Sequence, residues 1–119
     1  ANFIGDANIV KARIEMRNEN NYDIIFGGVQ MKISSNLDLK DIVSIALRPE
    51  KIGIKKEKTN NCIAAKIINA SYVGSCYQYV VSSSVGELFI VLNETINYFK
   101  LNEEVFITFD KSGITILED

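Results

Sequence analysis

The sequence Arg48-Pro49-Glu50 places an arginine and a carboxylate on either side of the only proline among 119 residues. Proline lacks a backbone donor and pushes the residue before it towards extended geometry. Arg48 is therefore expected to end a strand, and Glu50 to follow a corner. Two such charges can pair with each other or bind neighbouring backbone. From the residues alone, ordinary solvated charges at a strand end are the favoured interpretation, and a structural role at the corner is the alternative.

Acidic residues also gather towards the C-terminal end of the chain. Asp110 lies close in sequence to Glu103 and Glu104, and neighbouring carboxylates can bind a cation. A solvated acidic turn explains the same pattern and is the favoured interpretation. No metal site is predicted, because histidine is absent and the remaining acidic residues are scattered.

Tyr72, Tyr77 and Tyr79 could stack on nucleobases. The strand that would carry them has no interleaved lysine or arginine. The net charge of −2 and the pI near 5.2 also argue against a nucleic-acid partner, which normally needs a basic patch. Packing in the core or at an interface is therefore the better interpretation.

Several kinds of enzyme are excluded by what the sequence lacks. Without histidine, a Ser-His triad, a Cys-His pair or a His-based metal site cannot form. Gly27-Gly28 lacks the Gly-Lys-Ser/Thr that completes a Walker phosphate loop. No apolar run is long enough to span a membrane, and no leader is expected, so Cys62 and Cys76 are predicted to be reduced thiols in a cytosolic protein. No catalytic residue is predicted.

Alternating apolar residues between turn signals predict about ten short strands and no amphipathic helix. The Gly27-Gly28 pair between Tyr22–Phe26 and Val29–Ile33 predicts a hairpin. The polar run at residues 55–61 is the expected joint between two intertwined subdomains. Many short strands with frequent turns are typical of an all-β sandwich or small barrel, in which closure hides the strand edges. The other expected strands are 10–16, 42–47, 52–54, 63–73, 77–81, 87–92, 105–109 and 114–117.

An ordered set of short segments resembles the C-terminal TOBE domain of importer-type ABC transporter ATPases. Residues 2–8 (NFIGDAN) resemble the NFIGEAN segment that follows their nucleotide-binding domain, and residues 45–52 (IALRPEKI) resemble their aiRPE-x-I motif. The likeness covers almost the entire chain, and no single motif carries it alone. The later matches are Tyr72-x-Gly74, Tyr79-x-Val81 and Gly86-x-Leu88, followed by the closing strands at residues 105–109 and 116–117.

This resemblance implies an all-β fold of small barrels like the oligonucleotide/oligosaccharide-binding (OB) fold over residues 1–119, placed after an ATPase domain that this chain does not contain. The missing domain would bind and hydrolyse Mg-ATP. The chain alone is thus expected to hold no cofactor and to lack ATPase activity, although the full-length parent would be an enzyme. The implied partners are a second copy of the chain and the membrane-spanning permease subunits, at the inner face of the cell membrane. The residues of the structural or interface motif are Arg48, Pro49, Glu50, Tyr72 and Gly74.

The motifs look most like those of the ATP-binding subunits of spermidine/putrescine importers, whose relatives carry ferric iron, sulfate, glycerol phosphate or maltose. Ala65, Asn102 and Phe109 depart from the family pattern at backbone or core positions, which weakens the choice of subfamily. The alternative function is a module that senses a solute or an oxyanion in an iron, sulfate or sugar importer. A polyamine is a cation, so its expected site is acidic. The candidate residues for that site are Glu87, Glu94, Glu103, Glu104 and Asp110.

Overall fold

Apolar and polar residues alternate along many strands of this protein, so one face of each such strand is buried. In β3 (Asn21–Phe26), Tyr22, Ile24 and Phe26 are buried, and the residues between them are partly or fully exposed. Successive side chains of a strand point to opposite faces, so the pattern decides which side packs on the core. The computed structural model describes residues 2–4, 7–93 and 98–117, and the eleven strands found there pair antiparallel.

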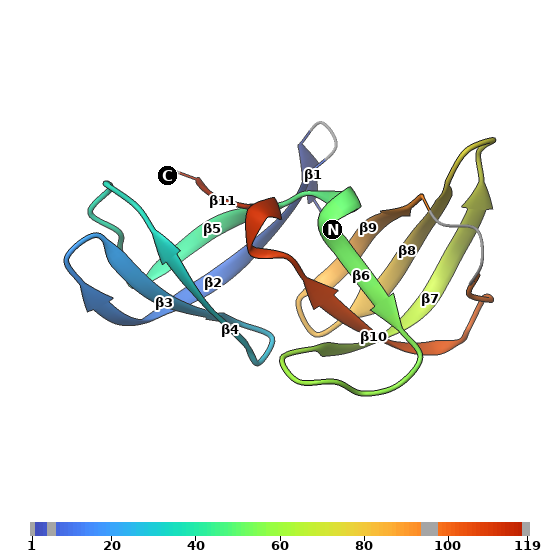
Figure 1. Cartoon of the computed structure of the whole chain (residues 1–119), viewed down its shortest axis with the longest axis horizontal. Helices are drawn as coiled ribbons and strands as arrows, with labels where there is room; N and C mark the ends of the chain where they lie inside the picture. The colour runs from blue at the N-terminus through green and yellow to red at the C-terminus, as the bar shows by residue number, and fades with distance from the viewer. Residues whose placement is uncertain (1, 5–6, 94–97, 118–119) are drawn as a thin grey trace.

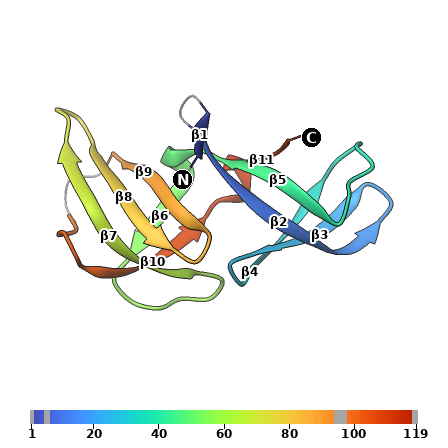
Figure 2. The ribbon, with the colours of Figure 1, turned by 180° about the vertical axis from the view of Figure 1, so that it is seen from behind.

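Two curled sheets lie side by side (Figures 1 and 2). The first has the order β11-β5-β2-β3-β4, with β1 paired to β2, and the second has the order β6-β10-β7-β8-β9. The first sheet contains β1 (Asn2–Ile4), β2 (Ala7–Asn18), β3, β4 (Val29–Ser34), β5 (Ile42–Leu47) and β11 (Ile114–Leu117). The second contains β6 (Ile52–Lys55), β7 (Ile63–Tyr72), β8 (Tyr77–Ser83), β9 (Gly86–Leu92) and β10 (Glu104–Phe109).

One apolar core serves both sheets. Ile24 and Ile45 of the first sheet belong to the same buried cluster as Ile67 and Ile107 of the second. Removal of this apolar surface from water is the main contribution that favours folding. The all-β fold predicted from alternation and turn signals is confirmed.

The turn between β3 and β4 has the geometry that its sequence predicts. Gly27 and Gly28 have φ angles of +58° and +85°, and positive φ at both central residues defines the type I′ turn of a tight hairpin. Phe26 and Val29 face each other across the two strands. The predicted Gly-Gly hairpin is therefore confirmed.

The chain passes from the first sheet to the second through η1 (Pro49–Lys51) and returns through η2 (Lys111–Gly113). Both are short 3-10 turns, and no helix in the described part of the chain is long and apolar enough to cross a membrane.

The division into two subdomains that meet near residues 55–61 stays a prediction. The loop at this position joins β6 to β7 of the second sheet. Asn61, in this loop, reaches back to β4 of the first sheet. Its Nδ2 donates to Gln30 O, and its Oδ1 accepts from Gln30 N–H, both at 2.8 Å.

Candidate functional site

The two connections between the sheets meet at a corner built from η1 and η2 (Figure 1). The Arg48 N–H donates to Gly113 O at 2.9 Å, and the Asp110 N–H donates to Lys51 O at 3.1 Å. Pro49 is buried at the first position of η1, where a turn needs no N–H donor and the fixed φ of proline is suitable. The Arg-Pro-Glu motif thus lies where the chain changes sheets.

The side chains of Arg48 and Glu50 pair with each other. Arg48 Nε donates to Glu50 Oε1 at 2.9 Å, and the two side chains are 61% and 42% exposed. An ion pair this exposed contributes at most about 1 kcal/mol. Backbone hydrogen bonds, rather than these two charges, hold the corner together. The interface role of the two side chains stays a prediction.

Gly113 fits into the corner because it has no side chain. It is buried, and a Cβ atom built on it would lie 2.3 Å from Lys51 Cβ and 2.8 Å from Lys51 Cγ. Glycine is therefore required by the close approach of η2 to η1. The sequence showed a turn at this position but gave no sign of the contact.

Asp110 caps η2. Its Oδ1 accepts hydrogen bonds from the Ser112 N–H at 2.9 Å and from Ser112 Oγ at 2.8 Å. These two bonds lower the pKa of the Asp110 carboxyl, and the charge of Lys51 lowers it further. Asp110 is thus a structural residue of the corner.

Acid is expected to weaken this corner. The pKa of Asp110 in the folded protein lies below its ordinary value of 3.8. The stability that the carboxylate contributes is therefore fully present above that value and is lost as the pH falls below it. Asp110→Asn should remove this part of the acid dependence, as measured by thermal unfolding between about pH 5 and pH 2. An unchanged acid dependence in the variant would assign it to other carboxylates.

The acidic residues that the structure describes do not converge on a cation site. Glu103 accepts from the Lys100 N–H at 3.0 Å and pairs with Lys56 at 3.7 Å. Within residues 2–4, 7–93 and 98–117, no three side chains of aspartate, glutamate, cysteine or histidine are placed to hold a metal ion. Glu87 lies on β9, and Glu94 lies outside the described residues.

A β-bulge places Tyr72 on the same face of the second sheet as Tyr77 and Tyr79. The register between β7 and β8 shifts between Ile67 and Asn69, because a bulge adds one residue to one strand. Tyr72 is paired directly with Tyr77, and directly opposite residues share a face. The extra residue also explains the weak alternation of β7 in the sequence.

The three predicted tyrosines differ in exposure. Tyr79 is 1% exposed, and its hydroxyl accepts from the Phe99 N–H at 3.0 Å. Burial raises the pKa of the Tyr79 phenol, and this hydrogen bond partly lowers it. Tyr72 is exposed and donates its hydroxyl to the carbonyl of Gly74, whose φ of +81° shapes the turn after β7. The Tyr77 ring lies 5.0 Å from that of Tyr72 and 6.0 Å from that of Tyr79.

The rings of Tyr72 and Tyr77 line an open groove of about 410 Å³. Tyr98 completes it, stacking on Tyr77 with ring centroids 6.3 Å apart and an interplanar angle of 19°. Lys100 and Leu101 follow along the same wall. The sequence did not reveal Tyr98, because it lies in a segment without periodicity whose path depends on tertiary packing.

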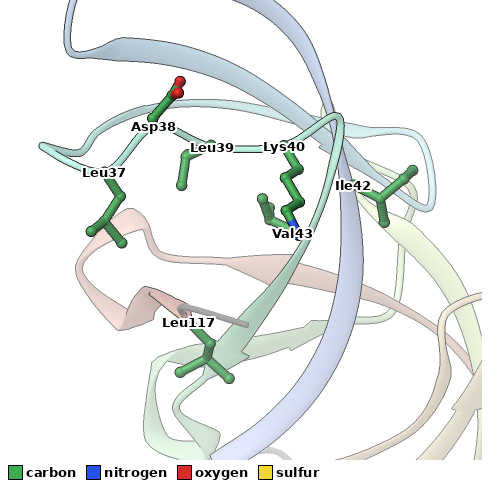
Figure 3. A pocket seen from close by; sticks show the side chains of 7 residues that line it. All are labelled: Leu37, Asp38, Leu39, Lys40, Ile42, Val43 and Leu117. Atoms are coloured by element: carbon green, nitrogen blue, oxygen red, sulfur yellow. The ribbon is translucent and has the colours of Figure 1, made fainter.

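A second hollow, of about 280 Å³, lies below the connection between β4 and β5 (Figure 3). Leu37, Leu39 and Val43 line it together with Leu117 of β11, and the carboxylate of Asp38 points away from it. Leu39 and Val43 are buried members of the core. The hollow is therefore an opening at the edge of the first sheet, lined by these apolar side chains and by Lys40.

Asn8 joins the two sheets, although the sequence showed it only as the end of a motif. It is 1% exposed in β2. Its Oδ1 accepts from the Phe89 N–H of β9 at 2.7 Å, and its Nδ2 donates to Phe89 O at 2.9 Å and to Leu47 O at 3.2 Å. The Asn8 side chain thus bonds to the backbone of β9 across the sheet-to-sheet contact.

Comparison with known proteins places this geometry in a family. The TOBE domain pattern matches residues 45–117, more than half of the chain. The chain is 23% identical to the Fe(3+) ions import ATP-binding protein FbpC of Agrobacterium fabrum, over 99% of its own length and 33% of that protein. It is 32% identical to the spermidine/putrescine import ATP-binding protein PotA of Nostoc sp., over 68% of its own length and 23% of that protein. It therefore spans a third or less of these relatives.

A solved structure has the same fold. The cytoplasmic molybdate-binding protein ModG superposes with a TM-score of 0.75 at 12% identity, covering 95% of this chain and 96% of that one. The identity is low, so the likeness concerns the fold alone. The family pattern over residues 45–117 is the stronger finding. The chain belongs to the TOBE domain family.

Proposed function

We propose that this chain is the C-terminal regulatory and dimerisation domain of the ATP-binding subunit of an ABC importer. The observation that carries the proposal is the match of nearly the whole chain to part of an importer's ATP-binding protein. A third of that relative corresponds to this chain, and the remainder would hold the machinery that binds and hydrolyses Mg-ATP. The full-length protein would bind the permease subunits at the inner face of the cell membrane.

The construction of the fold suits a domain that acts by contact. The Asn8 and Asn61 side chains each connect one sheet to the other, and backbone hydrogen bonds at the corner join the two segments through which the chain changes sheets. Two sheets joined by these contacts and by a common core move as a unit, so a force applied at one would reach the other. Such a body can steady a pair of ATPase domains while they open and close.

A polyamine is the solute that we propose. Support comes from the sequence resemblance to spermidine/putrescine importers and from the relative in Nostoc sp.. Ferric iron is the alternative, supported by FbpC relatives from Agrobacterium fabrum and Photobacterium profundum that match 99% and 98% of the chain. Vesicles that contain the full-length importer would separate the two, by comparing the uptake of labelled putrescine with the uptake of labelled ferric iron.

Self-association of the chain tests the proposed function, and Arg48 tests the interface. We expect a dimer in sedimentation velocity at about 100 μM, with Arg48→Ala weakening it about fivefold or more, as loss of a contact worth roughly 1 kcal/mol would. The melting temperature should stay within a few degrees, because the Arg48–Glu50 pair is exposed.

Arg17→Ala is the matched control, since Arg17 Nη2 also lies 2.9 Å from a carboxylate, that of Asp41, away from the corner. It should leave association unchanged. A chain that stays monomeric would overturn the dimerisation proposal. Equal effects of the two substitutions would remove Arg48 from the interface.

A further inference from the structure

The tyrosine groove of the second sheet has a closely packed floor. Tyr79 and Phe99 are buried there, with ring centroids 5.7 Å apart and planes at 76°, and the Phe99 N–H donates to the Tyr79 hydroxyl. Tyr77 covers Tyr79 with its ring tilted by only 22°. Ligand pockets are mostly lined by apolar and aromatic side chains, and about 410 Å³ suits a small molecule.

The walls of the groove present open ring faces. Tyr72 is 56% exposed and Tyr98 is 54% exposed. Tyr77 lies between them, 5.0 Å from the first ring and 6.3 Å from the second. A planar ring that stacks on such faces buries apolar surface on both partners. Loss of one stacking side chain typically weakens binding about fivefold or more.

Among the described residues that line the groove, the charge is positive. Lys100 is the charged side chain of its described lining. Lys56 lies 5.6 Å from the centre of the Phe99 ring and pairs with Glu103 at 3.7 Å. Because Glu103 also accepts the Lys100 N–H, its carboxylate is already engaged. The described lining of the groove is therefore more complementary to an anion than to a polyamine.

We propose that this groove binds a small planar aromatic anion. Its ring stacks on Tyr72, Tyr77 and Tyr98, and its carboxylate or phosphate faces the ammonium of Lys100. The inference goes beyond the proposed function, because it requires neither a second copy of the chain nor an ATPase domain.

Amide NMR titrations of the whole chain test this inference. Benzoate and phenyl phosphate serve as probes, and comparing them separates a carboxylate from a phosphate ligand. Cyclohexanecarboxylate keeps the charge without a ring face, and benzyl alcohol keeps the ring without the charge. We expect both aromatic anions to shift resonances around residues 70–77 and 98–101, with each control binding at least about fivefold more weakly.

Two substitutions separate the ring from the charge. Tyr98→Ala should weaken benzoate binding about fivefold or more, and Lys100→Gln should abolish the preference for benzoate over benzyl alcohol. Met16→Ala and Lys32→Gln are controls, because both residues are largely exposed on the first sheet. These controls should bind like the wild type.

Four results would overturn the inference. One is the absence of resonance shifts at about 20 mM probe, a concentration well above the dissociation constant expected for so few contacts. Another is equal binding of benzoate and cyclohexanecarboxylate, or binding of spermidine in their place. The last is a loss of self-association in Tyr98→Ala without any ligand binding in the wild type, which would assign the groove to a second copy. A monomeric chain that still binds benzoate would contradict only the dimerisation proposal.

Discussion

Replacing Gly113 with alanine is expected to lower the free energy of unfolding by about 3 kcal/mol and the melting temperature by roughly 10 °C. The added methyl group would lie 2.3 Å from Lys51 Cβ, far inside van der Waals contact. Relief requires η2 to move away from η1, which breaks the Arg48 N–H to Gly113 O hydrogen bond. The next strand, β11, would then lose its position beside β5. Urea and thermal unfolding measure the loss.

Two comparisons isolate the steric cause. Gly74→Ala introduces alanine at a φ of +81° where nothing lies within 4 Å of the new atom, so backbone strain alone should cost about 1 kcal/mol. In a Lys51→Gly background, Gly113→Ala should become nearly neutral, because both clashing carbons are gone. A loss in Gly113→Ala no larger than that in Gly74→Ala would contradict the close contact.

Local sequence signals predicted the strands of this fold well. The hairpin at Gly27-Gly28 needs only a two-residue turn with positive φ, which the sequence states directly. The break at Pro49 was likewise visible, because proline restricts its own φ and that of its neighbour. Both features depend on residues adjacent in the chain. They could be predicted because local geometry decides them.

Features that join distant segments could not be predicted in this way. The bulge between Ile67 and Asn69 arises from pairing with β8, and it decides that Tyr72 faces Tyr77. Tyr98 meets Tyr77 through packing, with no pattern in the sequence around it. The sequence therefore indicated some of the aromatic residues of the tyrosine groove, whereas the shape of the groove depended on tertiary contacts.

The corner between η1 and η2 likewise has a local part that the sequence predicts and a long-range part that it does not. Arg48 and Glu50 are the charged residues of the motif, yet the pair that their exposed side chains form contributes little to the corner itself. The contact that fixes the corner uses the backbone of Arg48 and the missing side chain of Gly113. Neither a backbone hydrogen bond across 65 residues nor the need for a glycine is encoded in local composition. Family motifs identify such positions without giving their physical cause.

Replacing Asn8 with leucine is expected to cost about 2–4 kcal/mol. The substitution keeps a side chain of similar size but removes three hydrogen bonds, two of them to the backbone of Phe89. Since Asn8 is 1% exposed, water cannot readily replace the lost partner. A buried backbone group that loses its partner costs about 1–3 kcal/mol. Equilibrium urea unfolding measures the total.

Asn61→Gly provides the matched control, because Asn61 makes a similar pair of bonds to the Gln30 backbone at the surface. Glycine tolerates the φ of +60° that Asn61 adopts, and water can reach the freed groups, so the loss should stay within about 1 kcal/mol. Hydrogen exchange should also separate the variants, with the Phe89 amide accelerated only in Asn8→Leu. Equal losses in the two variants would show that Asn8 does not hold β9 against the first sheet. A larger loss in Asn8→Leu, with faster exchange centred on β9, would show that the contact between the sheets depends on one buried amide.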